Sequence, residues 1–103
     1  MTRVDAFELS RLLEIANRAI EADELERLAR IEQADLETAY QDFKESVGLT
    51  RVEGNMPEWE QMLDATKAEY AAVQEAKRKA YNAKRRLQSA IQRHREASRR
   101  IAA

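Results

Sequence analysis

Basic side chains crowd the last quarter of the chain and are the residues best suited to bind a ligand. Residues 77–103 hold ten Lys or Arg and one acidic residue. On a helix, four recur every seven residues as one column, and three form a second column on its back. The first column is Lys79, Arg86, Arg93 and Arg100, and the second is Arg78, Arg85 and Arg99. A helix that carries such columns can bind nucleic-acid phosphates or an acidic protein groove.

The same basic residues have a second interpretation, as partners in ion pairs within the molecule. In an antiparallel hairpin they lie opposite residues 5–26, which hold seven acids and two arginines. Basic residues near a helix C-terminus also interact favourably with the helix dipole. We favour intramolecular pairing and keep nucleic-acid binding as the alternative. The back column is the part that pairing explains least.

Residue types that could support catalysis or metal binding are sparse. His94 is the only histidine and the chain has no cysteine, so the usual ligand sets for a transition metal are missing. The acidic residues are not paired with a candidate nucleophile, and no apolar pocket is evident that would raise the pKa of a general acid. We therefore expect no enzyme activity, catalytic residue, metal or cofactor.

Residues 57–101 set the architecture, because their pattern predicts one long helix. No Gly or Pro follows Pro57, and small or apolar residues recur at alternating spacings of three and four. This rhythm indicates a helix that buries one narrow seam against another helix. A helix of 45 residues is about 67 Å long, so the rest of the chain must lie along it. The predicted seam is Met62, Thr66, Glu69, Val73, Ala76, Ala80, Ala83, Leu87, Ala90, His94, Ala97 and Ile101.

The first half of the chain predicts a second helical arm of nearly equal length. Asp5 with Glu8 three residues later is a capping signal, and no Gly or Pro occurs from there to Val47. Gly48 and Gly54 mark the turn, and Asn55 with Glu58 is a second capping signal. The sequence thus predicts one all-α domain over residues 1–103. It is an antiparallel two-helix coiled-coil hairpin with arms 5–46 and 57–101 and turn 47–56.

The apolar residues of the first arm fall on two roughly opposite faces. One face holds Ala22, Leu25, Ala29, Leu36, Tyr40, Phe43 and Val47 and fits the seam. The other is a candidate partner-binding stripe of Leu9, Leu12, Leu13, Ala16, Ile20 and Ile31, with Glu8, Arg11 and Arg27 at its rim. A break near residues 20–23 would fold this stripe back into a three-helix bundle. A continuous helix would leave it uncovered, and we favour continuity because residues 21–30 are good helix formers.

Composition limits what such a hairpin can do. Charged residues make up 36% of the chain and aromatics 6%, so the core is a thin line of side chains with no enclosed pocket for a small-molecule substrate. We expect the largest side chains, Trp59, Met62, Leu63 and Tyr70, to form the strongest core near the turn, against Leu36, Tyr40 and Phe43. The absence of a long apolar run predicts a soluble, cytoplasmic protein with no membrane contact.

These observations favour a non-enzymatic module for protein–protein interaction or assembly, which self-associates as a homo-oligomer. Two hairpins can cover each other's stripes in a four-helix bundle. Buried Leu and Ile side chains then supply affinity, and the basic face orients the partner. Nucleic-acid binding through the basic half of the second arm is the alternative function.

Overall fold

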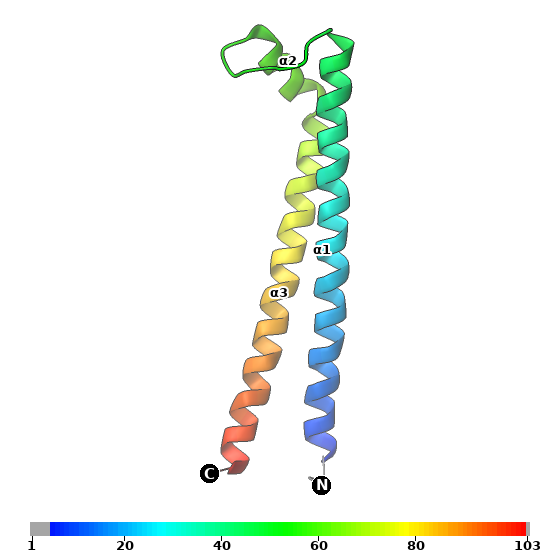
Figure 1. Ribbon diagram of the computed structural model, residues 1–103. Coiled ribbons are helices and arrows are strands. Elements are labelled where there is room, and N and C mark those ends of the chain that lie inside the picture. The colour runs from blue at the N-terminus through cyan, green and yellow to red at the C-terminus, as the bar shows by residue number, and fades with distance from the viewer. Residues whose placement is uncertain (1–4, 103) are drawn as a thin grey trace.

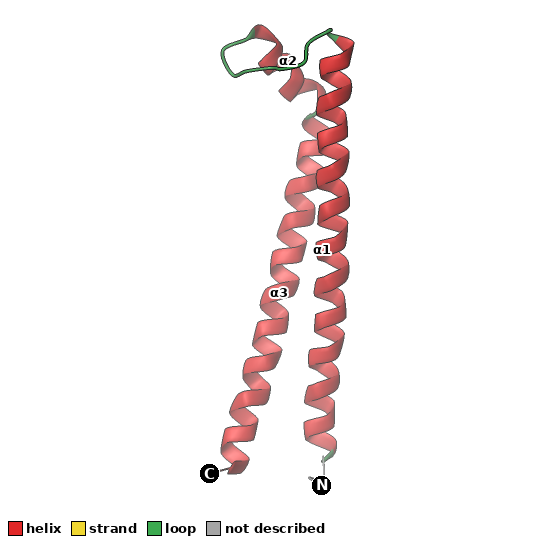
Figure 2. Ribbon diagram, in the orientation of Figure 1, coloured by secondary structure: helices red, strands yellow, loops and turns green. Residues whose placement is uncertain are grey.

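The structure is an elongated helical hairpin. The computed structural model describes residues 5–102, and Figure 1 shows α1 (Ala6–Ser46) and α3 (Lys67–Ala102) lying side by side, with the short α2 (Pro57–Ala65) at the turn end. The described part of the chain is 88% helix and contains no strand (Figure 2). The molecule measures 67 × 20 × 19 Å. The predicted all-α antiparallel hairpin is confirmed.

The first arm is one continuous helix of 41 residues. The backbone N–H of Glu8 donates to Asp5 Oδ1 at 2.7 Å, which is the predicted cap. At the other end Gly48 takes a φ of 72°. There the Leu49 N–H donates to the Lys44 carbonyl at 2.9 Å, and the Gly48 N–H donates to that of Glu45, a Schellman motif. The alternative break near residues 20–23 does not occur, since that stretch lacks any residue that would interrupt a helix.

The second arm, by contrast, is broken, and its prediction as a single helix over 57–101 was wrong. α2 ends at Ala65, and Thr66 takes φ −107° and ψ 14° before α3 begins. The Thr66 side chain is buried, and its hydroxyl donates to the Met62 carbonyl at 2.7 Å. A threonine that bonds back to the preceding turn bends a helix. Figure 1 shows the result, α2 turned aside from the long axis of α3.

The start of α2 also differs from the prediction. Met56, not Asn55, is the N-cap residue, and no side chain caps the helix. Pro57 follows in the first turn, where its missing N–H costs nothing because those donors lack helical acceptors. The Trp59 N–H donates to the Met56 carbonyl at 3.1 Å and closes that turn.

The seam between α1 and α3 follows the predicted alternation of three and four. In α3 every predicted seam position from Val73 to Ala97 is buried or half-buried, whereas Ile101 is exposed. Its most deeply buried members are Ala83, at 0% exposure, and Val73, at 1%. On α1 the matching buried or half-buried positions are Glu8, Arg11, Ile15, Arg18, Ala22, Leu25, Ala29, Glu32, Leu36, Ala39 and Phe43. Small residues at such positions let the two helix axes approach closely.

The core near the turn is smaller than predicted. Leu36 and Met62 are buried there, and Tyr40, Phe43 and Trp59 are half-buried. Leu63 and Tyr70 are exposed instead, because the bend at Thr66 changes the direction of the helix between them. The full burial of Val73, Ala80, Ala83 and Ala90 extends the core along α3 rather than concentrating it at the turn.

Candidate interaction surfaces

The predicted partner-binding stripe lies on the outer surface of α1. Leu9, Leu12, Leu13, Ile20 and Ile31 are between 40% and 63% exposed, and Ala16 is also exposed. Because α1 is continuous, neither α2 nor α3 covers these side chains. The stripe is therefore an apolar surface that the single chain leaves in contact with solvent.

Residues 9–20 of α1 show the reverse of the usual helical polarity. Every exposed residue in this stretch is uncharged, and the half-buried ones, which face α3, include all three charges: Arg11, Glu14 and Arg18. A surface helix normally turns its charged residues to solvent and its apolar residues inward. We call the exposed set the uncharged face; it consists of Leu9, Ser10, Leu12, Leu13, Ala16, Asn17, Ala19 and Ile20.

Two details of the predicted stripe need correction. Glu8 and Arg11 do not form its rim, since both are half-buried at seam positions of α1. Ile31 is separated from Ile20 by the charged residues of the intervening turns and does not extend the uncharged face. Sequence reasoning also missed Phe7, at 78% exposure, and Leu28, at 46%. Leu28 fits neither predicted face on a helical wheel, so the pattern gave no signal for it. Phe7 lies five helical turns before Leu25 and falls on the seam side, yet it is exposed.

Ion pairs tie the basic half of α3 to the first half of α1. Arg86 Nε donates to Glu21 Oε1 at 2.9 Å, and Arg93 Nη2 donates to Glu14 Oε1 at 2.5 Å. Both the arginines and the glutamates are seven residues apart, so the two pairs repeat along one side of an antiparallel seam. On the other side, Lys84 Nζ lies 3.0 Å from Glu26 Oε1. Pairing between the two arms thus engages Arg86 and Arg93 of the predicted first column.

Hydrogen bonds from arginines lower the pKa of two carboxyl groups, those of Glu21 and Glu75. The hydrogen bond from Arg86 holds the pKa of the Glu21 carboxyl below its ordinary value of 4.5. Within α3, the hydrogen bonds from Arg78 likewise lower the pKa of Glu75, and the guanidinium pKa of Arg78 rises in return. Lys79 also contacts this carboxylate, at 3.9 Å. The charged forms of both pairs are therefore favoured in the folded protein.

Arg85, Arg99 and Arg100 make no ion pair with a carboxylate of residues 5–102. Arg85 lies over the Tyr81 ring, with its guanidinium carbon 5.9 Å from the ring centre. Arg99 and Arg100 are exposed and make no ion pair with any residue the structure describes. Of the predicted back column, Arg78 alone has a carboxylate partner among residues 5–102.

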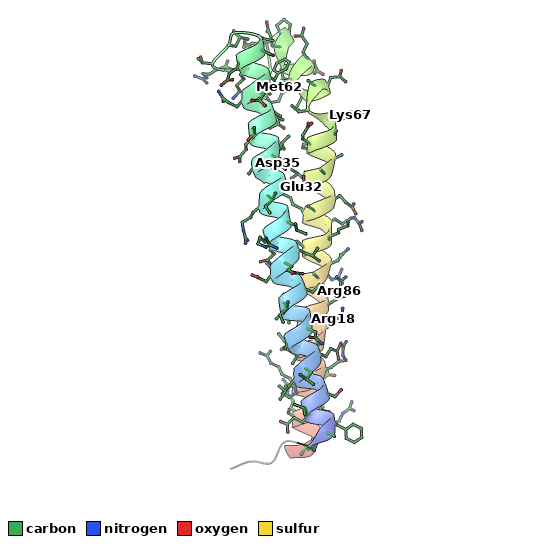
Figure 3. All side chains as sticks on the ribbon, turned by 90° about the vertical axis from the view of Figure 1, so that its right-hand side faces the viewer. Arg18, Glu32, Asp35, Met62, Lys67 and Arg86 are labelled. Carbon is green, nitrogen blue, oxygen red and sulfur yellow. The ribbon has the colours of Figure 1, made fainter. Side chains whose placement is uncertain are left out.

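One surface groove gathers four arginines between α1 and α3. It is lined by Arg18, Asn82, Arg85, Arg86, Ser89 and Arg93. Figure 3 shows Arg18 of α1 and Arg86 of α3 at nearly the same level of the hairpin. Glu14 and Glu21 offset part of this positive charge through their ion pairs. The fold thus brings four guanidinium groups to one groove.

Several polar side chains occupy the seam between α1 and α3 near the termini. Arg11, Arg18 and His94 occupy half-buried seam positions there. Arg11 Nε and His94 Nδ1 are buried without a hydrogen-bond partner, as is Glu69 Oε2 nearer the turn. A buried polar atom without a partner lowers stability.

The described residues offer no metal site and no membrane-spanning helix, and known proteins give no further guide. In residues 5–102 no group of three or more His, Asp or Glu side chains is placed to hold a metal ion. Over the same residues no helix combines the length and hydropathy needed to cross a bilayer. No protein family, curated protein or solved structure matches the chain.

Proposed function

We propose that this hairpin is a non-enzymatic, cytoplasmic assembly module that self-associates through the uncharged face of α1. The observation that carries the proposal is the reversed polarity of residues 9–20. Their charges meet α3, whereas Leu9, Leu12, Leu13 and Ile20 face outward. Contiguous exposed apolar surface of this kind marks an interaction site.

The energy available at the uncharged face suits a reversible complex. Burying one Leu or Ile side chain contributes about 1.5–3 kcal/mol. Four such side chains on each of two copies offset the loss of translational and rotational freedom, which costs about 4–15 kcal/mol. The surplus is small, and we expect dissociation constants in the micromolar range. Two hairpins joined in this way contribute four helices to one bundle.

The shape of the molecule supports an interaction role over a catalytic one. The grooves lie on the outside of a single seam, and the perturbed carboxyl groups Glu21 and Glu75 are each engaged by an arginine within the hairpin. Neither carboxyl group has a raised pKa, as a general acid at neutral pH requires. Ion pairing of this kind orients and stabilises the helices.

Replacing Leu13 by Asp tests the proposal. Leu13 is 55% exposed in the single hairpin, so Leu13→Asp should leave helical content and unfolding free energy nearly unchanged. It should raise the dimer dissociation constant more than about 100-fold, because each interface contains two copies of the change. Sedimentation equilibrium at micromolar concentration measures this constant directly.

Ala34→Asp is the matched control. Ala34 lies 21 residues after Leu13, three heptads along the same exposed side of α1, and outside the uncharged face. The control should dimerise like the original chain. A strictly monomeric mass for the original chain would refute self-association. Global unfolding of Leu13→Asp would show that the stripe belongs to the core.

Nucleic-acid binding is the second candidate, and the groove lined by four arginines is the observation that favours it. Arg99 and Arg100 extend the positive surface beyond that groove. If phosphates bind there, log affinity should fall linearly with log salt, by nearly one unit of slope for each phosphate contacted. Arg85→Glu with Arg99→Glu should weaken such binding without unfolding the hairpin. No gel shift of a labelled duplex or single strand at low salt would exclude this function.

A further inference from the structure

Resting on the proposed self-association, we infer that the two hairpins pair antiparallel through α1, with the two-fold axis passing beside Ala16. The apolar side chains of the uncharged face are distributed about this alanine in both directions. Leu13 and Leu12 lie three and four residues before it, and Ala19 and Ile20 lie three and four residues after it. An antiparallel two-fold pairing brings positions equally far before and after the axis to the same level.

This register matches the residues well. Leu12 of one copy lies level with Ile20 of the other, and Leu13 lies level with Ala19. At the axis the Ala16 residues of the two copies face each other, and their small side chains let the helices approach closely. Residues 12–20 of the uncharged face are thus covered by the same residues of the second copy, whereas Leu9, seven residues before the axis, lies level with the exposed Asp23.

The register sets Glu8 level with the acidic Glu24, but one pair of opposite charges lies at each end of the contact. Eleven residues before Ala16 stands Asp5, and eleven residues after it stands Arg27. In the antiparallel register each Arg27 lies level with the partner copy's Asp5, once at each end of the contact. Both residues are exposed, and neither makes an ion pair within residues 5–102. Exposed pairs of this type orient a complex more than they strengthen it.

The distribution of charge along the hairpin disfavours the parallel arrangement. We call residues 28–76 the turn half; it carries 11 acidic and four basic side chains. We call residues 5–27 and 77–101 the terminal half; it carries 13 basic and eight acidic side chains. Parallel hairpins place the two acidic turn halves side by side along their length. Pairing about Ala16 instead directs the turn halves away from each other.

A fully overlapped antiparallel pair would match the charges of the two halves better. It would not, however, bury the uncharged face of one copy against that of the other. It lays Leu9, Leu13 and Ile20 against the turn half of the partner copy, whose exposed α1 surface includes Arg30 and Glu37. Burial of several Leu and Ile side chains outweighs exposed charge pairs, which contribute about 0–1 kcal/mol each. The register about Ala16 is therefore the one that the residues favour.

Disulfide cross-linking tests the arrangement, because the chain has no cysteine of its own. Ala16→Cys should form a covalent dimer rapidly on mild oxidation, since close antiparallel helices bring the two Cα atoms near the range of about 4.4–6.8 Å that a disulfide spans. Leu9→Cys should not cross-link to itself, because its two copies lie about 21 Å apart along the axis at about 1.5 Å per residue. A mixture of tagged Leu12→Cys and untagged Ile20→Cys should give the mixed dimer in excess over either self-dimer.

Gln92→Cys, exposed on α3, controls for random collision and should stay uncross-linked. Self-cross-linking of Leu9→Cys as fast as Ala16→Cys would mean parallel pairing and overturn the inference. A dimer by sedimentation in which Ala16→Cys fails to cross-link would overturn the register and leave self-association intact. A monomer by sedimentation would refute both, and would assign the uncharged face to a different occupant.

Discussion

At the scale of single residues, several charged side chains form ion pairs between the two arms of the hairpin. Glu14, Glu21 and Glu26 of α1 hold Arg93, Arg86 and Lys84 of α3. These contacts occupy much of the basic block that the sequence offers for binding other molecules. The pair with Arg93 also explains why Glu14 faces α3 and is absent from the uncharged face.

The Glu21–Arg86 pair makes stability depend on pH in a defined direction. Because the pKa of Glu21 is lowered in the folded state, its contribution is present above pH 4.5 and is lost as pH falls below that value. The thermal midpoint should therefore drop between pH 6 and pH 3. Glu21→Gln should lower the midpoint at pH 6 and make the drop smaller, as followed by circular dichroism.

Glu24→Gln is the control for this measurement. Glu24 lies three residues after Glu21 on the same helix and makes no ion pair within the described part of the chain. It should retain the full pH dependence of the original chain. An unchanged pH profile for Glu21→Gln would show that the pair with Arg86 does not contribute to stability.

At the scale of the helices, small side chains fill the most deeply buried seam positions of α3. Ala83 is fully buried and Ala80 and Ala90 are nearly so, although none of them is large. Because Ala83 has no exposed surface, a longer side chain there would have to displace its neighbours. Ala83→Leu should lower the free energy of unfolding by about 1–3 kcal/mol through overpacking.

Urea denaturation measures this effect, and Ala34→Leu provides the comparison. Ala34 is exposed on α1, and its change to Leu adds the same atoms outside the seam. It should alter stability by less than about 0.5 kcal/mol. Equal effects of the two substitutions would mean that the seam does not pass through Ala83.

The sequence predicted the hairpin and its seam because both depend on periodicity. Alternating spacings of three and four identified Val73, Ala80, Ala83 and Ala90, and all four are buried. The exposure of the stripe from Leu9 to Ile20 was also foreseeable, because one helix cannot turn two opposite faces to the same neighbour. These features follow from helix geometry alone.

Two features of the structure could not be predicted from the sequence, because they depend on the hydrogen bonds and directions of individual side chains. The bend at Thr66 comes from a hydroxyl that bonds to the Met62 carbonyl, and a threonine at a seam position does not reveal that choice. The inward direction of Arg11 and Arg18 is equally hidden, because a charged residue at a seam position contradicts the ordinary pattern of polarity. These departures from the pattern define the uncharged face.

At the scale of the whole molecule, the hairpin is a charge dipole along its length. The turn half is net acidic and the terminal half net basic, although the chain as a whole carries a net charge of only −1. Pairing about Ala16 overlaps the two basic terminal halves head to head. Like charges then oppose an association that apolar burial drives.

Salt should therefore strengthen the dimer. At 10 mM salt the screening length is about 30 Å, so the two terminal halves repel each other across the contact, whereas at 150 mM it is about 8 Å. We expect the dissociation constant from sedimentation to fall over this range, despite weakening of the exposed Asp5–Arg27 pairs, which contribute little. A fully overlapped antiparallel dimer sets acidic halves against basic halves, and its dissociation constant would rise instead. The sign of the salt dependence thus separates the two antiparallel arrangements without any substitution in the chain.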